Sequence, residues 1–562
     1  MARVNLPHRP LQRTAARRGG FALTAEAALL ACSLLWAVLA NRPFFRAALA
    51  DRGLDSFGDW AFAASLFVAL AALHFVLLAL VTPRFLLKPV LALSIVATAF
   101  ATHFMQHLGV VLDPSMIRNV LRTDVHEARE LFSLSMLPTL ALAGVLPLLL
   151  LWKLRIVARP VGAAVAWRTG SVVAALALLV GAVLLQFQPL ASLMRNQKEV
   201  RYLVTPGNIV WSLASVAGLD ARAAAGPRQP IGLDAKPGPR MAARGAPGAR
   251  PLVVVLVVGE TARAANWGLN GYARQTTPQL SKLPVVSFTD VTACGTNTET
   301  SLPCMFAPIG RRDYDEARIR QQETLLQVVA RAGVGVRWRD NQSGCKGVCD
   351  GLPNERVRDV VPPGQCDGER CLDEGLLHGL PEWLKAARGT QLLVLHQLGN
   401  HGPSYFRRYP PAFERFTPAC RNDDLRRCSP EEITNAYDNA LLYTDHVLAT
   451  LIGQLDAAAG DVDSALVYVS DHGESLGEKN LYLHGLPYAI APDVQKKVPM
   501  FTWWSPGYAA ASGLDPACVR RRAAEPAAHD HLFHTLLSML DVQTALHAPD
   551  WDLARGCAKA AP

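Results

Sequence analysis

Five long apolar segments in the first 190 residues constrain this 562-residue chain more than any other feature of its sequence. A helix that crosses a membrane needs about 20 consecutive, mostly apolar residues. Such segments run over residues 21–40, 61–82, 88–108, 136–154 and 170–190. Buried helices of a soluble protein are the alternative, but soluble cores rarely supply five nearly uncharged stretches of this length. The first segment follows a basic stretch, as a signal peptide does, but four more follow, so we interpret it as a retained helix.

The distribution of basic residues predicts how these helices are oriented. The first 20 residues carry five arginines, namely Arg3, Arg9, Arg13, Arg17 and Arg18. The segment between the fourth and fifth helices carries Lys153, Arg155, Arg159 and Arg168 without an acid. Loops rich in Lys and Arg stay in the cytoplasm, whereas the loop over residues 109–135 mixes both charges and can lie outside. Five spans from a cytoplasmic amino terminus therefore place everything after about residue 190 on the outer side.

Cysteine usage points to the same outer compartment. Of 11 cysteines, Cys32 alone lies in the apolar part, and the other ten follow residue 290. Neighbours in sequence suggest the pairs Cys294/Cys304, Cys345/Cys349, Cys366/Cys371 and Cys420/Cys428, which leaves Cys518/Cys557 by elimination. An even set confined to one external domain is typical of disulfides in an oxidising compartment. The alternative is metal binding by Cys345 and Cys349, but no second thiol pair has the matching spacing.

Charge and composition limit the kinds of partner that this protein can bind. The net charge of +9 is compatible with an anionic membrane surface. Nucleic acid is not expected as a partner, because the arginines are scattered and no RNA- or DNA-binding motif is present. Residues 218–250 are rich in Ala, Gly, Pro and Arg without apolar periodicity, which predicts a flexible or surface-bound linker.

Beyond the linker, strand-like and helix-like segments alternate. Three short runs of aliphatic residues, Leu252 to Val258, Leu392 to Leu395 and Ala465 to Ser470, indicate buried strands. Helical patterns over 322–332 and 431–458 separate them. The predicted class is α/β with a mixed or mostly parallel sheet, in which ligands bind beyond the carboxyl ends of the strands.

Acidic and imidazole side chains follow these strands. Glu260 comes after the first run, His401 after the second, and Asp471 and His472 after the third, with His484 in the next polar loop. Oxygen and imidazole ligands without thiolates suit a catalytic zinc ion. A single histidine in a loop is more often a surface group, but recurrence at strand ends and the adjacent ligands of the DHGE segment (471–474) favour a metal site.

A hydroxyl nucleophile is the remaining requirement of such a site. The segment 293–304 places Thr296, Thr298, Thr300 and Ser301 between two cysteines whose disulfide would hold the loop rigid. A hydroxyl beside a metal can lose its proton, and a helix beginning here would further stabilise the anion. The alternative is a helix-capping segment with ordinary hydroxyls, and the spacing does not choose among the four.

Several motifs resemble the lipid A phosphoethanolamine transferases, including the mobile colistin-resistance enzymes, within the alkaline phosphatase/sulfatase superfamily. The resemblance covers nearly the whole chain and includes ASLMRNQKEVRYLVTP (191–206), VVGETARAANWGLNGYARQTTPQL (257–280), CGTNTETSLPCMF (294–306), DNQSGCKGVCDGLP (340–353), LHQLGNHGPSYFRRYP (395–410), YVSDHGESLGEKNLYLHGLPYAIAP (468–492) and HLFHTLLSMLDV (531–542). It implies an amino-terminal domain of five transmembrane helices (1–190), a bridging segment and linker (191–250), and a periplasmic catalytic domain of sulfatase-like α/β fold around a central sheet (251–562).

The resemblance also implies roles for individual residues. It makes Thr298 the nucleophile and assigns a primary zinc ion to Glu260, Thr298, Asp471 and His472. It assigns His401, His484 and Glu474 to a second zinc ion or to substrate phosphate. It assigns contacts with phosphoethanolamine to Ser343, Lys346, Asn119, Thr123 and Glu127. The last three fall at i, i+4 and i+8, which predicts one face of a helix, although an ordinary amphipathic surface helix has the same spacing.

The function implied is transfer of phosphoethanolamine from phosphatidylethanolamine to a phosphate of lipid A through a phosphoethanolamine-threonine intermediate. This lowers the negative charge of the cell surface and confers polymyxin resistance on a bacterium carrying the enzyme in its inner membrane. The alternative keeps the transfer and changes the acceptor to a lipopolysaccharide core sugar or another periplasmic group. A membrane-anchored binding protein with an inactive hydrolase fold is disfavoured, because Thr298 and every ligand are present. The oligomeric state stays open.

Overall fold

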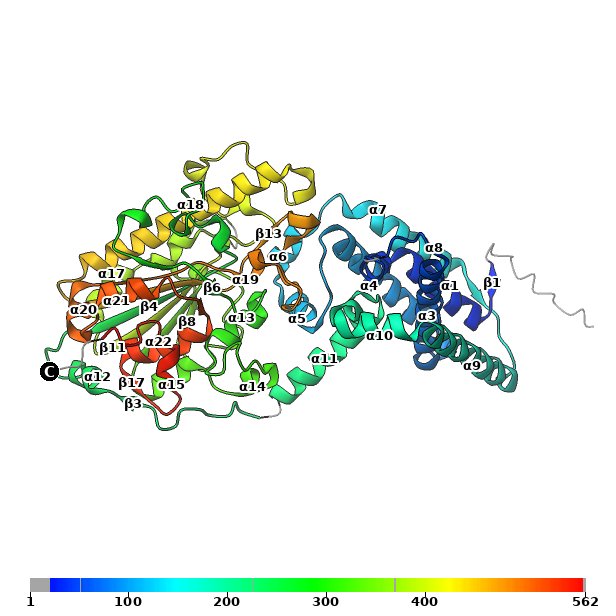
Figure 1. Cartoon of the computed structure of the whole chain (residues 1–562), viewed down its shortest axis with the longest axis horizontal. Coiled ribbons are helices and arrows are strands. Elements are labelled where there is room, and N and C mark those ends of the chain that lie inside the picture. Colours follow the sequence, from blue (N-terminus) through cyan, green and yellow to red (C-terminus); the bar gives the residue numbers. More distant parts are fainter. Residues whose placement is uncertain (1–20, 51, 225, 368–369, 559–562) are drawn as a thin grey trace, which may run out of the picture. The chain divides into compact units, whose positions relative to one another are not determined.

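The chain of this computed structural model, which describes residues 21–50, 52–224, 226–367 and 370–558, divides into two compact units (Figure 1). The first unit comprises Met1–Thr102, Pro138–Lys198 and Val204–Pro206. The second comprises His103–Leu137, Glu199–Leu203 and Gly207–Pro562. The five amino-terminal arginines used to predict the orientation lie outside the described residues.

Apolar helices dominate the amino-terminal part of the chain. Four helical segments in the described residues are long and apolar enough to cross a membrane: Phe57–Val81 (α3), Arg84–His107 (η1 and α4, Leu87–His107), Met136–Lys153 (α7, Met136–Leu140; η2, Ala141–Val145; α8, Leu146–Lys153) and Val161–Leu185 (α9). The helices α1 (Ala25–Leu39) and α2 (Arg42–Ala48) meet at 57° and together make a fifth candidate. The first predicted span, residues 21–40, corresponds to α1 alone, and the candidate crossing continues through α2 after the bend. Asn41 lies at the bend and donates from its amide to the Trp36 carbonyl at 2.9 Å.

The first unit has its own apolar core. Helix α3 packs against α1 and α9, and the core includes Leu29, Trp36, Phe75, Leu91 and Ile95. A short parallel pair of strands, β1 (Ala22–Leu23) and β2 (Arg155–Ile156), and the helix α10 (Phe187–Asn196) complete it.

Arg168 lies inside α9, not in the connecting segment where the sequence pattern placed it. Its guanidinium donates to the Ala79 carbonyl at 2.9 Å, at the end of α3, and lies 3.7 Å from the Glu26 carboxylate. Arg159 pairs with the same carboxylate at 3.1 Å. These arginines therefore neutralise Glu26 and satisfy carbonyl groups at a helix end.

A mixed seven-stranded sheet forms the centre of the second unit, in the order β5-β15-β12-β4-β11-β7-β8. Its strands are β4 (Leu252–Gly259), β5 (Val286–Phe288), β7 (Gly335–Asp340), β8 (Asn354–Arg356), β11 (Thr390–His396), β12 (Asp463–Ser470) and β15 (Met500–Trp504). All neighbouring pairs are parallel except those made by β15, which runs antiparallel to β12 and β5. The predicted α/β class and the three predicted strands are confirmed.

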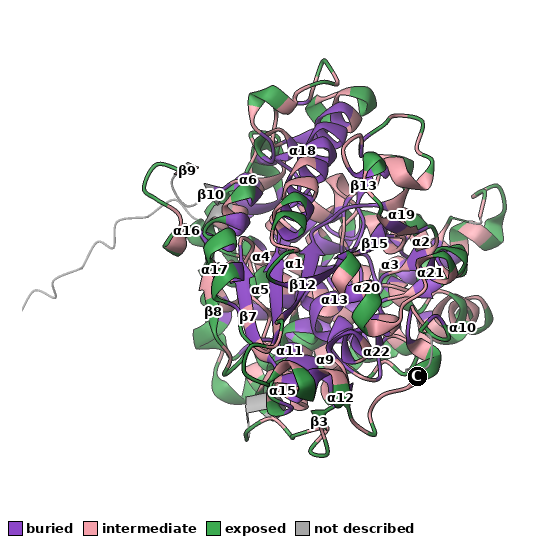
Figure 2. Cartoon of the chain, turned by 90° about the vertical axis from the view of Figure 1, so that its left-hand side faces the viewer, coloured by how far each residue is buried: buried purple, intermediate pink, exposed green. Residues whose placement is uncertain are grey.

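The β4 run of aliphatic residues explains why the sheet is covered on both faces. Val254, Leu256 and Val258 pack into one hydrophobic core, whereas Val253 and Val255 pack into the core on the opposite face. Side chains alternate between the faces of a strand, so an unbroken apolar run requires cover on both sides. Each fully buried Val or Leu contributes about 1.5–3 kcal/mol. The strands at the centre of the sheet are buried (Figure 2).

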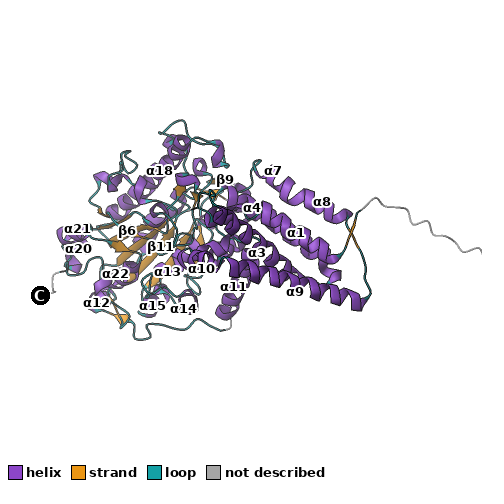
Figure 3. Ribbon diagram, turned by 45° about the vertical axis from the view of Figure 1, so that its right-hand side comes forward, coloured by secondary structure: helices purple, strands orange, loops and turns teal. Residues whose placement is uncertain are grey.

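Helices cover the two faces of the sheet (Figure 3). One face carries α13 (Thr298–Met305), α15 (Leu325–Arg331), α20 (Pro506–Ser512), α21 (Pro516–Arg522) and α22 (Asp530–Leu540). The other carries α16 (Val357–Val360), α17 (Leu380–Ala386) and α18 (Pro430–Ala457). Helix α18 begins with a capping box, in which Ser429 and Glu432 satisfy each other's backbone N–H groups and Pro430 occupies the first turn.

Smaller elements complete the second unit. These are α5 (Pro114–Arg122), α6 (Val125–Glu130), α11 (Gly207–Ala224), α12 (Pro239–Arg244), α14 (Glu316–Gln321), α19 (Asp493–Lys496), β3 (Lys236–Pro237), β6 (Val291–Thr292), β9 (Cys366–Asp367), β10 (Arg370–Cys371), β13 (Ser475–Leu476), β14 (Tyr482–Leu483), β16 (Ala527–Ala528) and β17 (Val542–Gln543). The linker prediction for 218–250 is wrong at its start, because α11 continues to Ala224. All five predicted cysteine pairs form disulfides, and Cys32 is free.

Candidate active site

The register of three central strands sets the position of the candidate site. Gly259, the last residue of β4, pairs with Ser470, the last residue of β12. On its other side β4 pairs Val258 with His396, the last residue of β11. The residues that follow these strand ends, including Glu260 and Asp471, must therefore lie side by side at one edge of the sheet.

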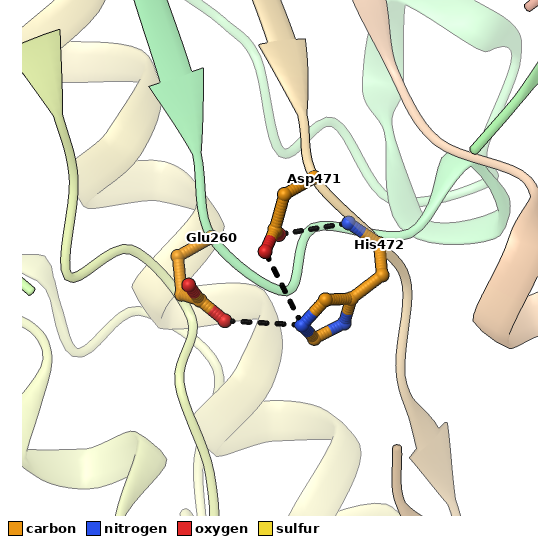
Figure 4. Close-up of side chains that lie close together, drawn as sticks. All are labelled: Glu260, Asp471 and His472. Carbon is orange, nitrogen blue, oxygen red and sulfur yellow. Dashed lines mark hydrogen bonds and ion pairs between the residues drawn. The ribbon is translucent and has the colours of Figure 1, made fainter. Parts of the chain in front are cut away.

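Glu260, Asp471 and His472 form a compact cluster at this edge (Figure 4). One potential ligand atom from each lies within 4.8 Å of the others, and all three residues are buried. The Nε2 atom of His472 lies 3.3 Å from a Glu260 oxygen and 3.4 Å from an Asp471 oxygen. Its Nδ1 atom lies 2.9 Å from the Gly473 carbonyl and can donate to it, which leaves Nε2 facing the carboxylates.

The charges of this cluster call for a compensating cation. Burial lowers the pKa of His472, but Asp471 and Glu260 outweigh it and raise that pKa to about 10. Burial raises the pKa of Asp471, and the neighbouring Glu260 raises it further. Burial also opposes ionisation of Glu260, yet the hydrogen bond with His472 holds its pKa well below the usual range. Two carboxylates in one buried place thus require a proton on His472 or a metal cation in its stead.

The donor set fits a metal ion. The Oδ2 atom of Asp471 is buried and accepts no hydrogen bond from any described residue, and it faces His472 Nε2 at 3.4 Å. Two carboxylates and one imidazole, without thiolates, are ligands that zinc accepts in catalytic sites. Glu260, Asp471 and His472 could therefore hold a zinc ion.

Among the four hydroxyl candidates, Thr298 is the one that lies against the cluster. Its Oγ1 atom is 3.3 Å from a Glu260 oxygen and 3.4 Å from His472 Nε2. The Thr296 hydroxyl instead donates to the Leu486 carbonyl at 2.6 Å, and the Ser301 hydroxyl donates to the Asp471 carbonyl. Thr300 is half-buried. The sequence pattern left this choice open, and the geometry favours Thr298.

The chain around Thr298 is fixed from three directions. Thr298 is the first residue of α13, and the Asn297 side chain caps that helix by accepting from the Thr300 N–H. The Cys294–Cys304 disulfide joins the loop to the end of the same helix. A helix amino terminus stabilises negative charge, so α13 favours an anionic oxygen on its first residue.

His529 is a third support, and the sequence analysis missed it. Its ring accepts from the Cys294 N–H at 3.0 Å and donates to the Ser470 carbonyl at 2.9 Å. Burial lowers the pKa of His529 to about 3, so the ring stays neutral and can do both. It ties the Thr298 loop to the end of β12. No spacing in the sequence indicates this, because the residues joined are more than 50 positions apart.

Further polar residues extend the cluster. The rings of His472 and His484 lie 4.3 Å apart, and those of His484 and His401 lie 5.6 Å apart. His484 Nδ1 is 3.1 Å from a Glu474 oxygen, and His401 Nε2 is 3.1 Å from a Glu127 oxygen. Burial lowers the pKa of His401, but Glu127 more than offsets this and raises it to about 9. His401 is therefore protonated near neutral pH.

The predicted single helix through Asn119, Thr123 and Glu127 is wrong. Helix α5 ends at Arg122, Thr123 is extended with φ −64° and ψ 131°, and α6 begins at Val125. The Thr123 hydroxyl donates to the Asn119 carbonyl at 2.8 Å, as hydroxyls at helix ends often do. Because the helix breaks here, Glu127 turns to His401, whereas Asn119 and Thr123 contact each other.

Ser343 and Lys346 lie in the loop after β7. Lys346 Nζ donates to the Ser343 hydroxyl at 2.6 Å and pairs with Glu299 at 3.4 Å. Glu299 directly follows Thr298, and its carboxylate also pairs with Arg122 at 3.1 Å. The sequence analysis passed over Glu299 and Arg122, although an acid beside a candidate nucleophile is a signal that could have been used.

Asp340 and His396 form a buried pair that the sequence analysis also missed. Asp340 Oδ2 lies 2.9 Å from His396 Nδ1 and accepts from Trp338 Nε1 at 2.9 Å. Asp340 Oδ1 accepts from the backbone N–H groups of Gln342 and Gly344. The pair fixes the start of the loop that carries Ser343 and Lys346.

A cavity of about 340 Å³ opens beside Asp340, Ser343 and His401. Its wall includes Glu127, Ser343, His401, Arg122 and Arg408. Its size and mixed charge suit a small polar group that carries both a negative and a positive charge.

The fold and the buried cluster at the strand ends define a sulfatase-type α/β domain. A family model described as Sulfatase matches residues 253–542, and one described as Phosphoethanolamine transferase EptA/EptB matches residues 70–220. The chain is 38% identical over 536 residues to the phosphoethanolamine transferase EptA of Escherichia coli (strain K12), covering 94% of this chain and 96% of that protein. It is 37% identical over 521 residues to the phosphatidylethanolamine transferase Mcr-2 of Escherichia coli, covering 91% and 94%.

A solved structure supports the same relationship along the whole length. The integral membrane lipooligosaccharide phosphoethanolamine transferase A of Neisseria meningitidis superposes with a TM-score of 0.90 at 34% identity, covering 96% of this chain and 99% of that one. The chain belongs to the phosphoethanolamine transferase family, as its motifs suggested. It is a multi-pass inner-membrane protein whose sulfatase-like domain lies in the periplasm.

Proposed function

We propose that this enzyme transfers phosphoethanolamine from phosphatidylethanolamine to a phosphate of lipid A through a covalent bond to Thr298. The observation that carries the proposal is the position of Thr298 Oγ1, which lies 3.3 Å from Glu260 and 3.4 Å from His472 at the start of α13. The related enzymes are named as phosphoethanolamine and phosphatidylethanolamine transferases, and the matching solved structure is named for lipooligosaccharide.

Glu260, Thr298, Asp471 and His472 are the residues that would hold a zinc ion. When bound, zinc supplies positive charge that lowers the pKa of a neighbouring hydroxyl and offsets charge on phosphate. His401, His484 and Glu474 lie beside this group and would hold a second ion or the substrate phosphate. The buried Oδ2 atom of Asp471, which accepts no hydrogen bond from a described residue and faces His472 Nε2, supports the first assignment.

In the first half-reaction the Thr298 oxygen attacks the phosphorus of phosphatidylethanolamine. A bond forms between phosphorus and Thr298 Oγ1, and the bond between phosphorus and the glycerol oxygen breaks. The proton lost by Thr298 is balanced by the one that the departing diacylglycerol takes up. Protonated His401 is placed to donate to phosphate oxygens, and the α13 amino terminus stabilises the Thr298 oxyanion before attack.

Side chains that line the cavity beside His401, together with neighbouring residues, would orient the headgroup. Lys346 and Ser343 would contact the phosphate, and Glu127 offers a carboxylate to the ammonium group. Asn119 and Thr123 would contribute further contacts from the α5 end. Holding the headgroup in line with Thr298 supplies much of the rate gain in phosphoryl transfer.

In the second half-reaction an oxygen of the lipid A phosphate attacks the same phosphorus. The new phosphorus–oxygen bond links two phosphates, the bond to Thr298 breaks, and the Thr298 oxygen regains a proton from the acceptor phosphate or from water. The product carries an added ammonium group, so cationic peptides such as polymyxin bind the cell surface less well.

The test is the mass spectrum of lipid A from cells that express the wild type, Thr298→Ala or Thr300→Ala. The wild type and Thr300→Ala should add phosphoethanolamine, and Thr298→Ala should lose transfer by at least about 1,000-fold, as removal of a nucleophile does. Transfer by Thr298→Ala at the wild-type rate would contradict the covalent mechanism. Unmodified lipid A beside a modified core sugar would contradict the acceptor.

A further inference from the structure

A second cavity lies next to the first, and Arg122 and Ser343 line both. It measures about 610 Å³ and shares only these two residues with the first cavity among the described residues that line each. Its wall consists of Arg122, Asp220, Arg228, Glu299, Arg320, Ser343, Lys346, Gly347 and Asp350. No apolar side chain of the described residues lines it, so it does not suit an acyl chain.

Four cations converge on this cavity from four separate segments. Arg122 ends α5, Arg228 follows α11, Arg320 lies in α14, and Lys346 lies in the loop after β7. Three acids face them, so the wall carries one net positive charge. A set of convergent guanidinium groups is the usual protein device for recognising phosphate or carboxylate groups.

Glu299 organises three of the four cations. Its side chain is fully buried and lies 3.1 Å from Arg122, 3.4 Å from Lys346 and 3.8 Å from Arg320. Arg320 also donates to the Glu299 backbone carbonyl at 2.8 Å. Because Glu299 directly follows Thr298, the inner wall of this cavity is built on the residue next to the proposed nucleophile.

Arg228 is the cation whose counter-ion is easily exchanged. In the described part of the chain its ion-pair partner is Asp350, at 3.2 Å, and the Asp350 side chain is 64% exposed. An exposed pair of this kind contributes little, so an incoming anion can take the place of Asp350. The guanidinium has five N–H donors, and one carboxylate uses only some of them.

The position of Arg228 is fixed by its surroundings. The next residue, Gln229, is held by backbone hydrogen bonds with Gln321 at 2.7 Å and Glu323 at 2.9 Å. A Cβ atom on Gly347 would lie 2.3 Å from Arg228 Nη2, and Gly347 has φ +87°. Glycine at this position lets the guanidinium approach the loop that carries Lys346.

We infer that this second cavity binds the phosphorylated sugar headgroup of the acceptor, with Arg228 and Arg320 as its phosphate contacts. The inference rests on the proposed two-step transfer, in which donor and acceptor react in turn at Thr298. The donor headgroup occupies the first cavity, where the Glu127 carboxylate faces its ammonium group. The anionic acceptor approaches through the second cavity, which the four cations line.

The test separates the two half-reactions in the purified full-length protein in detergent. Fluorescent phosphatidylethanolamine reports diacylglycerol released in the first turnover, and transfer to increasing amounts of lipid A reports the KM for the acceptor. Arg228→Gln should raise that KM by about tenfold, the cost of a lost charge-assisted contact. Its first-turnover release should stay within about twofold of the wild type.

Two further variants sharpen the test. Asp350→Asn removes the competing counter-ion and should leave the acceptor KM unchanged or lower it. Arg421→Gln is the matched control, because Arg421 pairs with Glu414 at 2.7 Å on the surface and lines neither cavity. It should change neither readout.

Three outcomes would overturn the inference. The first is an unchanged acceptor KM in Arg228→Gln. The second is a loss of diacylglycerol release in Arg228→Gln as large as its loss of transfer, which would place Arg228 in the donor site or in the scaffold. The third is a higher acceptor KM in Asp350→Asn, which would make the ion pair itself the required feature. If the wild type releases diacylglycerol without modifying lipid A, the proposed acceptor fails as well, and that result appears without any variant.

Discussion

At the scale of single residues, burial decides what each group of the site can do. Asp471 and Glu260 are buried beside His472, so a nearby cation must compensate their negative charge. Thr298 differs from Thr296 and Ser301 not in chemistry but in where its oxygen points. The residue scale is therefore where metal binding and nucleophile choice are tested.

Asp471→Asn should lower the zinc affinity of the protein by at least about 100-fold, because a carboxylate ligand is replaced by a weaker amide. The measurement is the zinc content of the purified protein after dialysis, by elemental analysis. Asp463→Asn is the matched control, since Asp463 is a buried carboxylate at the opposite end of the same strand and pairs with Arg244. Full zinc content in Asp471→Asn would contradict the assigned ligands.

Asp340→Asn should destabilise the protein by about 2 kcal/mol near pH 5.5 and by less near pH 9, because a buried charge-assisted hydrogen bond is lost. Burial disfavours the charged form of both partners. Their mutual attraction outweighs burial, so the pKa of His396 rises above 6.5 and the pKa of Asp340 falls below 3.8. The His396 contribution is complete below pH 6.5 and is lost as pH rises through the raised pKa.

The Asp340 contribution is complete above pH 3.8 and is lost as pH falls through the lowered pKa. The pair therefore stabilises the protein most between these two values. Melting temperatures of wild type and Asp340→Asn, compared near pH 5.5 and near pH 9, measure the difference. A difference that grows from acidic to alkaline pH would show that the pair is not charged as inferred.

At the scale of elements, the site depends on how helices begin and end. Helix α13 begins at Thr298, and the break between α5 and α6 turns Glu127 toward His401. Strand register brings Glu260 and Asp471 together. Loops between elements carry the chemistry, so the supports of those loops should matter for activity.

Removing the Cys294–Cys304 disulfide, in Cys294→Ala/Cys304→Ala, should lower the free energy of unfolding by about 3 kcal/mol, since the unfolded chain gains freedom. Transfer should fall more than about tenfold, because Thr298 loses its fixed position. Enzyme assays and melting curves measure both effects.

The control is Cys420→Ala/Cys428→Ala, which removes a disulfide of similar span, eight residues instead of ten, that lines neither cavity. It should lose stability and keep most of its transfer activity. Equal loss of transfer in both double variants would mean that the first disulfide acts only through stability.

At the scale of the whole molecule, the number of membrane crossings decides on which side the catalytic domain lies. Within the described residues, four helical segments and one bent pair, α1 with α2, are candidates. With a cytoplasmic amino terminus, five crossings reach the periplasm and four do not. We therefore expect the bent pair to cross the membrane.

A reporter enzyme that is active only in the periplasm tests this arrangement. Fused after Ala158, between α8 and α9, it should be inactive, because the basic residues there stay in the cytoplasm. Fused after Pro562 it should be active. Activity after Ala158 would contradict the orientation, and inactivity after Pro562 would exclude the crossing of the bent pair.

The sequence by itself determined the apolar helices, the α/β class and the strands before Glu260 and Asp471, and it suggested the cysteine pairs, of which Cys518/Cys557 rested on elimination alone. The helices follow from the length of the apolar segments, the strands from local apolar runs, and the cysteine pairs from proximity in the sequence. It also carried the family motifs, which pointed to Thr298 before any geometry did.

Only the tertiary structure decided which hydroxyl faces the carboxylates and where the helix through Thr123 breaks. It also decided that Glu299 collects Arg122, Arg320 and Lys346, and that His529 joins the Thr298 loop to β12. Such contacts join residues from distant parts of the chain, and no local spacing encodes them. A site whose charges are balanced across so many segments exists only once the sheet has brought its strand ends together.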